Sequence, residues 1–321
     1  MIHVKHRVID PAGAFFGLLV PVLCALGGVV LTTLWDPRLP DKIATHWSMT
    51  SADGFATPTT SAWTFALLTI LFGAGLSAIA ALAPAMLMMR RFMIVLGLIV
   101  VGIITGGQVA SLHAQLDVVD PSAVPAPIGA LAAGALGGCV VGLLGASLLR
   151  DYRQRTAATE APNRALPRSD AALPITDDVG FSTKGSVIFG LIMAAPGIFL
   201  GLVSSAWFLA LFLVLAVFCV TLVRFRVVVD TTEIKVFNMG MPAMTYGVDE
   251  VVGAKVAEIK PFADFGGWGL KSKGRRNYGI VTRTGPAVVI TFAGGDKLTV
   301  TTPKADDIAG ALNSLADARS S

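Results

Sequence analysis

Six long runs of apolar residues constrain the fold of this 321-residue chain more than any other feature. Most of them reach the roughly 20 residues that an α-helix needs to cross the hydrocarbon core of a bilayer. The runs are uniformly apolar and do not alternate, so they predict helices and not the strands of a membrane barrel. They cover residues 12–35, 62–89, 92–112, 127–149, 186–204 and 206–223. Pro84 is expected to end or kink the long second run.

Charged residues are scarce and lie mainly between these runs. They make up 14% of the chain, against about 25% in average soluble proteins. The net charge of +4 would suit a nucleic-acid-binding protein, but no nucleic-acid-reading motif is present. Cys24, Cys139 and Cys219 all lie inside apolar runs without metal-ligand spacing. We therefore expect no nucleic-acid partner, no metal and no cofactor.

The distribution of Lys and Arg predicts the orientation. Basic residues gather before the first run, after the second, between the fourth and fifth, and after the sixth. The alternate loops contain only Arg38 and Lys42. Because positive loops stay on the cytoplasmic side, both termini are predicted to be cytoplasmic and the loop 36–61 extracytoplasmic. Residues 1–149 then form a four-helix membrane unit, and 186–223 form a two-helix membrane hairpin.

The composition and residue pattern predict two segments that lie outside the membrane. Residues 150–185 are rich in Pro, Ala, Arg and Asp without an apolar period, which predicts a flexible cytoplasmic linker. Residues 224–321 alternate with period two and end in a segment with helical spacing, at Ile308, Leu312 and Leu315. They predict a cytoplasmic antiparallel β-barrel closed by a helix. Its seven expected strands are RFRVVVD, EIKVFN, AMTYGV, GAKVAEI, YGIVTR, AVVITFA and KLTVTT.

The first outer loop, LPDKIATHWSMTSADGFATP, carries a specific pattern. With the spans on both sides it resembles the bacterial membrane family called domain of unknown function 1648, over about the first ninety residues. That family shows Leu-Pro, a spacer, Ile-Pro-x-His-Trp or His-Phe, and then Gly. Ala44 replaces the second proline of the pattern, and Asp53 precedes the glycine instead of following it. The matching residues are Leu39, Pro40, Ile43, His46, Trp47 and Gly54.

This family overlaps immunity proteins that protect cells from the sporulation-delaying toxin, a secreted peptide. The resemblance therefore implies a multi-pass protein of the bacterial plasma membrane, not an enzyme, that meets an extracellular peptide. Pro40, His46, Trp47 and Gly54 become the candidate ligand contacts. The competing interpretation is that Trp47 rests at the lipid interface while His46 only braces the loop.

The C-terminal segment GGWGLKSKGRRNYGI resembles the bacterial pleckstrin-homology-like domains, which carry a Gly-Trp-Gly turn followed by a basic residue. Gly267, Trp268 and Gly269 match the turn. A site for an anionic lipid or a protein partner is one interpretation of this segment, and a solvated loop is the other. The candidate residues are Trp268, Lys271, Lys273, Arg275 and Arg276.

Small residues repeat every four positions in the fourth run, at Gly134, Gly138 and Gly142. Such a row lets helix backbones approach closely, either within the chain or across a homodimer seam.

Two functions remain open. One is a receptor or immunity-type protein that senses an extracellular peptide and signals through its cytoplasmic domain. The other is a transporter or permease-like protein for an uncharged solute. None of the six runs contains an ionisable Asp, Glu, Lys or Arg, which argues against an ion-coupled pump.

Overall fold

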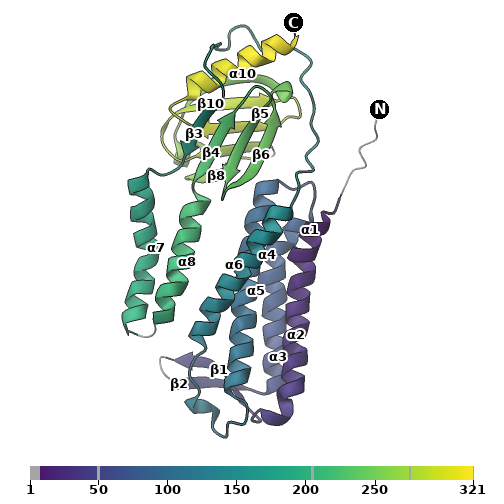
Figure 1. Cartoon of the computed structure of the whole chain (residues 1–321), viewed down its shortest axis with the longest axis vertical. Coiled ribbons are helices and arrows are strands. Elements are labelled where there is room, and N and C mark those ends of the chain that lie inside the picture. Colours follow the sequence, from purple (N-terminus) through teal and green to yellow (C-terminus); the bar gives the residue numbers. More distant parts are fainter. Residues whose placement is uncertain (1–7, 49–50, 204–205, 275, 321) are drawn as a thin grey trace. The chain divides into compact units, whose positions relative to one another are not determined.

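The computed structural model describes residues 8–48, 51–203, 206–274 and 276–320. The chain divides into two compact units, and Figure 1 labels the elements of both. Unit 1 comprises Met1–Arg153 and Met193–Val214, and unit 2 comprises Gln154–Ile192 and Leu215–Ser321.

All six apolar runs are helical over most of their described residues, as predicted, although residues 82–86 interrupt the second run. Five helical segments are long and apolar enough to cross a membrane, which defines a multi-pass membrane protein: Pro11–Arg38, Pro58–Ala81, α5 (Leu87–Ala114), α6 (Ile128–Leu148) and α7 (Thr183–Val203). The sixth helix, α8 (Ala206–Leu222), is equally apolar but has 17 residues. At 1.5 Å per residue it is about 25 Å long, somewhat less than the hydrocarbon core.

The first two segments are compound helices, each with a π-helical turn. The first consists of α1 (Pro11–Ala14), η1 (Phe15–Leu19), α2 (Val20–Trp35) and η2 (Asp36–Arg38). The second consists of α3 (Pro58–Leu68), η3 (Thr69–Ala74), α4 (Gly75–Ser77) and η4 (Ala78–Ala81). The Ser77 hydroxyl donates to the carbonyls of Gly17 (2.7 Å) and Gly73 (2.9 Å), and so links the two segments near both π turns. The second segment ends shortly before Pro84, as the sequence predicts.

The glycine row of α6 packs against α5 of the same chain. A Cβ at Gly134 would overlap the carbonyl oxygen of Gly102, and one at Gly138 would overlap that of Leu98. At Gly142 the added atom would lie 2.8 Å from the Val95 Cα. The small residues are therefore needed for backbone contact within the chain. The row that suggested a homodimer seam thus has an intramolecular partner.

Unit 2 contains two β-sheets. The first has the order β3 (Ile175–Val179), β4 (Phe225–Val229), β5 (Glu233–Asn238) and β6 (Met241–Gly247), and all of its pairs are antiparallel. The second has the order β7-β10-β11-β9-β8, with α10 (Ala305–Ser320) packed against β7 and β10. Its strands are β7 (Val251–Ile259), β8 (Gly269–Ser272), β9 (Asn277–Val281), β10 (Gly285–Phe292) and β11 (Lys297–Thr301).

All seven predicted strands and the closing helix are present, but the predicted antiparallel barrel is wrong. The strands of the described residues form two separate sheets, and β9 pairs with β11 in parallel. Two strands, β3 and β8, were not predicted. Only the two ends of β3, Ile175 and Val179, are buried, so its polar centre hides the strand pattern. The core of this unit is mainly aliphatic but includes the stacked rings of Tyr246 and Phe292. Ile308 and Leu312 of α10 are buried in it as their spacing predicts, whereas Leu315 is half-buried.

The segment predicted to be a flexible linker is packed onto unit 2. Arg168 forms two bonds with the Asp317 carboxylate of α10 (2.8 and 3.1 Å). Asn313 of α10, which is fully buried, donates to the carbonyl of Pro167 (2.8 Å). Ala158 donates its backbone N–H to the carbonyl of Asp249 (2.8 Å). Side chains of a distant helix thus bind the backbone of this segment, which its own composition could not reveal.

Candidate functional site

The first outer loop of unit 1 folds into a β-hairpin, β1 (Ile43–Ser48) and β2 (Ser51–Ala56). Figure 1 shows it at the end of the unit opposite α1. Hydrogen bonds from Ala44 to Gln115 and from Trp47 to Val124 join the hairpin to the second loop of the same end, residues 115–127. At the same end of the unit, Arg38 and Asp117 form an ion pair, in which the Arg38 Nε and the Asp117 Oδ1 lie 3.2 Å apart. Both of its side chains are exposed, so solvent screens this pair strongly.

Gln115, at the C-terminal end of α5, holds the hairpin from inside. Its side-chain oxygen accepts the backbone N–H of Ala44 (2.6 Å), and its amide nitrogen donates to the Ala44 carbonyl (3.2 Å). The same nitrogen donates to the Ser111 hydroxyl (3.0 Å). Gln115 and Ala44 are completely buried. The amide therefore satisfies both buried backbone groups of Ala44, and the Ser111 hydroxyl adds a longer bond to the carbonyl (3.5 Å).

Trp47 anchors the hairpin to the second loop. Its indole N–H donates to the backbone carbonyl of Val124 (2.8 Å), and the ring is half-buried. The hydrogen-bond partner of this indole N–H is therefore a backbone group of the protein and not a lipid headgroup. Pro40 lies half-buried in the turn that precedes β1.

His46 is exposed on this fixed hairpin and points its Nδ1 at Asp53. The two atoms, His46 Nδ1 and Asp53 Oδ1, are 2.6 Å apart, and the side chains are 70% and 43% exposed. Two compensating register shifts, on either side of His46, leave Asp53 unpaired in the ladder. Such bulges re-aim side chains. Gly54 is opposite His46, and a Cβ there would lie 2.7 Å from the His46 Cβ, so glycine permits this close approach.

Asp53 collects hydrogen bonds from both neighbours. Ser48 donates its hydroxyl to the second carboxylate oxygen, and His46 donates from Nδ1. The Ser48 bond first, and then His46, hold the pKa of Asp53 below its usual range. A carboxylate on Nδ1 leaves the other ring nitrogen, Nε2, to bind a further group. The order of contacts differs from a hydrolase triad, because Ser48 bonds the carboxylate and not the imidazole.

The candidate site is therefore an exposed His–Asp pair on the hairpin. Among the described residues, no three His, Cys, Asp or Glu side chains gather closely enough to hold a metal ion. His113, which lies in the same end of the unit, packs its ring against Trp35 instead (6.1 Å between centroids).

A Gln115→Leu variant is expected to loosen this hairpin. It leaves the buried N–H of Ala44 without its partner and the Ala44 carbonyl with only the Ser111 hydroxyl at 3.5 Å, and a buried group left unsatisfied costs about 1–3 kcal/mol. Hydrogen–deuterium exchange over residues 43–48 should accelerate, and the melting temperature should fall. Gln108→Leu is the matched control, because Gln108 is buried in the same helix and its amide nitrogen has no partner within the described residues. Unchanged exchange in Gln115→Leu would contradict the assigned role.

The opposite end of unit 1 contains a buried ion pair that sequence reasoning missed. Arg90 Nη2 donates to Asp10 Oδ2, and the two side chains are 0% and 1% exposed. Arg90 also donates to the carbonyls of Ala80 and Arg150 (3.0 Å each). Asp10 in turn caps α1 by accepting the N–H of Ala12 (2.9 Å). Four chain segments therefore converge on one pair of charges.

Arg91, next in sequence, caps the end of α6. Its Nε donates to the carbonyl of Ala146 (2.9 Å) and its Nη2 to that of Leu149 (3.3 Å), which belong to the last turn of that helix. The third apolar run was expected to begin after Arg91, with both arginines in a polar loop. The structure corrects this, because α5 begins at Leu87 and encloses both arginines. Inside the protein, both guanidinium groups donate hydrogen bonds to backbone carbonyls.

In unit 2, the structure separates the predicted basic residues. Arg276 donates to the Gly294 carbonyl and lies 3.8 Å from the Asp296 carboxylate, so it braces a turn. Lys271 and Lys273 make no ion pair within the described residues. Trp268 is 52% exposed, between glycines with positive φ at positions 267 and 269. Arg275 lies outside the described residues.

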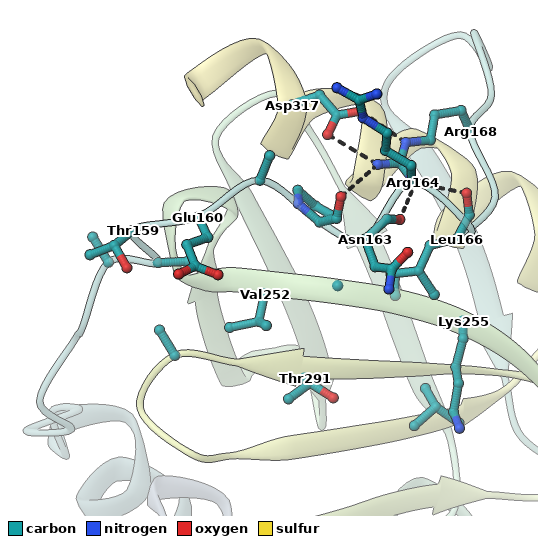
Figure 2. Close-up of a pocket in the computed structure, with 18 of the residues that line it drawn as sticks. Thr159, Glu160, Asn163, Arg164, Leu166, Arg168, Val252, Lys255, Thr291 and Asp317 are labelled. Carbon is teal, nitrogen blue, oxygen red and sulfur yellow. Dashed lines mark hydrogen bonds and ion pairs between the residues drawn. The ribbon is translucent and has the colours of Figure 1, made fainter. Parts of the chain in front are cut away.

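The described residues of unit 2 line hollows of different size. The larger, of about 1520 Å³, is a groove bordered by residues 156–168, β7 and β10. Figure 2 shows that Arg168 reaches Asp317 and backbone carbonyls at one edge, while Lys255 and Thr291 lie apart from this network. The smaller, of about 730 Å³, is lined by residues including Phe181, Arg224 and Asn238. Asn238 donates to the Arg224 carbonyl (2.8 Å), just after α8 ends, and its side-chain oxygen is buried without a partner in the described chain.

Together these features define a multi-pass membrane protein with an ordered hairpin at one end of its helical unit and a separate two-sheet unit. No protein family, no curated protein and no solved structure matches the chain. Both resemblances therefore stay predictions.

Proposed function

We propose that the chain is a non-enzymatic receptor or immunity-type protein of the bacterial plasma membrane, which recognises an extracellular peptide through the β1–β2 hairpin and signals inward through unit 2. The observation that carries the proposal is the His46–Asp53 pair, which is exposed on an otherwise anchored hairpin. The outward orientation of the hairpin rests on the distribution of basic residues.

The hairpin is organised before any ligand arrives. Ile43 and Ala44 are buried against the helices, whereas His46 and Ser48 are exposed further along the same strand. A rigid base with an exposed tip reduces the ordering cost of binding. The free imidazole Nε2 and the anionic Asp53 together offer hydrogen-bonding groups that match the N–H groups and basic side chains of a peptide.

We expect His46→Ala to reduce the response to the extracellular peptide while leaving folding unchanged. The side chain is mostly exposed and contacts only Asp53 among the described residues through its ring nitrogens, so its removal costs little stability. The measurement compares survival, or binding, of cells that carry parent and variant protein when challenged with fractionated secreted peptides. Membrane abundance and melting temperature are recorded in parallel.

Trp47→Phe is the control for anchoring. It removes the bond to Val124 and should loosen the hairpin, with a change in hydrogen exchange that His46→Ala does not produce. If His46→Ala abolishes folded protein, or leaves the peptide response at the parent level, the recognition role is wrong. Solute flux through reconstituted protein that His46→Ala leaves intact would instead favour a transporter.

A further inference from the structure

Unit 2 exposes an aromatic cluster at the point where its chain enters helix α7. The cluster is formed by Phe181, Phe262 and Trp268. The Trp268 ring lies 4.9 Å from that of Phe262 and 6.0 Å from that of Phe181, both in edge-on geometry. Phe181 precedes α7 by two residues and also contacts Phe189 within it (5.7 Å). The cluster therefore continues the apolar surface of a membrane-spanning helix.

Its outer members are much more exposed than large apolar side chains usually are. Phe262 is 63% and Trp268 is 52% exposed. The first turns of α7 in the same unit expose Val187, Ile188 and Leu191 to a similar extent, which is normal for a helix that faces lipid. Aromatic rings at such a position suit the interface between hydrocarbon and headgroups.

The backbone conformation around Phe262 and Trp268 exposes their rings. Phe262 lies on the short helix α9 (Pro261–Phe265), whose Phe265 turns inward and covers Gly279. The chain then passes through Gly266, Gly267 and Gly269, all with positive φ. Glycine adopts this backbone without the penalty that other residues suffer. The tight turn leaves Trp268 standing out between the glycines.

Four lysines without a carboxylate partner flank the residues of the cluster in sequence, and one of them, Lys273, places its ammonium over the Phe265 ring (6.0 Å to the centroid). Lys184 lies on the first turn of α7, Lys260 precedes α9, and Lys271 and Lys273 follow Trp268. None of the four makes an ion pair with a carboxylate in the described part of the chain, and the nearby Asp264 accepts the backbone N–H of Lys260 (2.7 Å). Cations that flank an apolar tip suit a bilayer that contains anionic lipid.

We propose that the α9–β8 turn, Pro261–Gly269, docks unit 2 onto the membrane surface beside α7, with Phe262 and Trp268 inserted among the lipids and Lys271 and Lys273 against anionic headgroups. The partner is the lipid surface itself. The inference does not rest on peptide recognition by the hairpin, because it involves different residues in a different unit.

The test uses full-length protein in nanodiscs of phosphatidylcholine with and without phosphatidylglycerol. Phe262→Cys, in a background with the three native cysteines replaced by alanine, carries an environment-sensitive fluorophore. We expect spin-labelled lipids to quench it and aqueous iodide to quench it poorly. Val252→Cys is the control, because Val252 is an exposed apolar residue on the groove side of the same unit. It should show the reverse pattern.

Lysine replacement separates the electrostatic contribution to docking from the contribution of the inserted aromatic rings. Lys271→Gln with Lys273→Gln should lower the docking equilibrium constant about fivefold for each lysine in phosphatidylglycerol discs and have little effect in pure phosphatidylcholine. Trp268→Cys gives a second probe position if Phe262→Cys does not fold. Quenching of both probes by iodide and not by lipid would overturn the proposal. Protection of both from iodide and lipid alike would also overturn it, because protein would then cover the cluster.

Discussion

An Arg90→Ala variant is expected to lose about 3–5 kcal/mol of stability, because it leaves the Asp10 carboxylate charged and buried without its partner. The same change frees the carbonyls of Ala80 and Arg150. The loss should appear as a large fall in the thermal unfolding midpoint of the purified protein. Arg90→Lys keeps the charge but not the planar fork of donors, so its midpoint should fall between those of the parent and Arg90→Ala.

The matched control is Arg38→Ala, which breaks the exposed ion pair with Asp117 at the other end of the same unit. Water and salt screen that pair, so the midpoint should barely move. A double variant, Asp10→Ala with Arg90→Ala, should lose less than the sum of the single changes, since it strands no buried charge. Equal midpoints for Arg90→Ala and Arg38→Ala would refute the structural role of the buried pair.

A Gly138→Leu variant is expected to separate α5 from α6 and to reduce the yield of folded protein sharply. Any Cβ at this position meets the backbone of Leu98, which cannot rotate away as a side chain can. Overpacking costs about 1–3 kcal/mol in well-packed cores, and a clash with backbone belongs at or above the upper end. The measurements are the fraction of monodisperse protein after extraction and its melting temperature.

Gly137→Leu tests the same change one position away. Gly137 has no heavy atom within 4 Å of the site that a Cβ would occupy, so the leucine should be tolerated in lipid. If both variants behave alike, the effect comes from helix propensity or membrane insertion and not from the α5–α6 contact.

The sequence predicted helices and strands well where one physical requirement dominates. Long apolar runs must be helical in lipid, and the alternating segments after Arg224 must be strands. The closing helix followed from the spacing of Ile308, Leu312 and Leu315, of which the structure buries the first two and half-buries the third. Pro84 was expected to end or kink the second run, and the helix does end at Ala81. These features depend on local pattern alone.

The remaining features depend on partners that are distant in sequence. Arg90 reads as a loop charge until Asp10, eighty residues away, is placed beside it. Gln115 reads as an ordinary polar residue at a helix end, although it satisfies both backbone groups of Ala44. The pattern around His46 was visible as a motif, but its pairing with Asp53 depends on bulges in the hairpin that residue spacing does not specify.

Strand β3 has a consequence for the biogenesis of the protein. It precedes α7, yet its ladder partner β4 follows α8, with Ile175 opposite Val229. When ribosomal synthesis has produced β3, that partner does not yet exist, and both intervening helices must be made first. The first sheet therefore cannot close until the helical hairpin has left the ribosome. Its completion also holds together, by backbone hydrogen bonds, the two chain ends from which that hairpin departs.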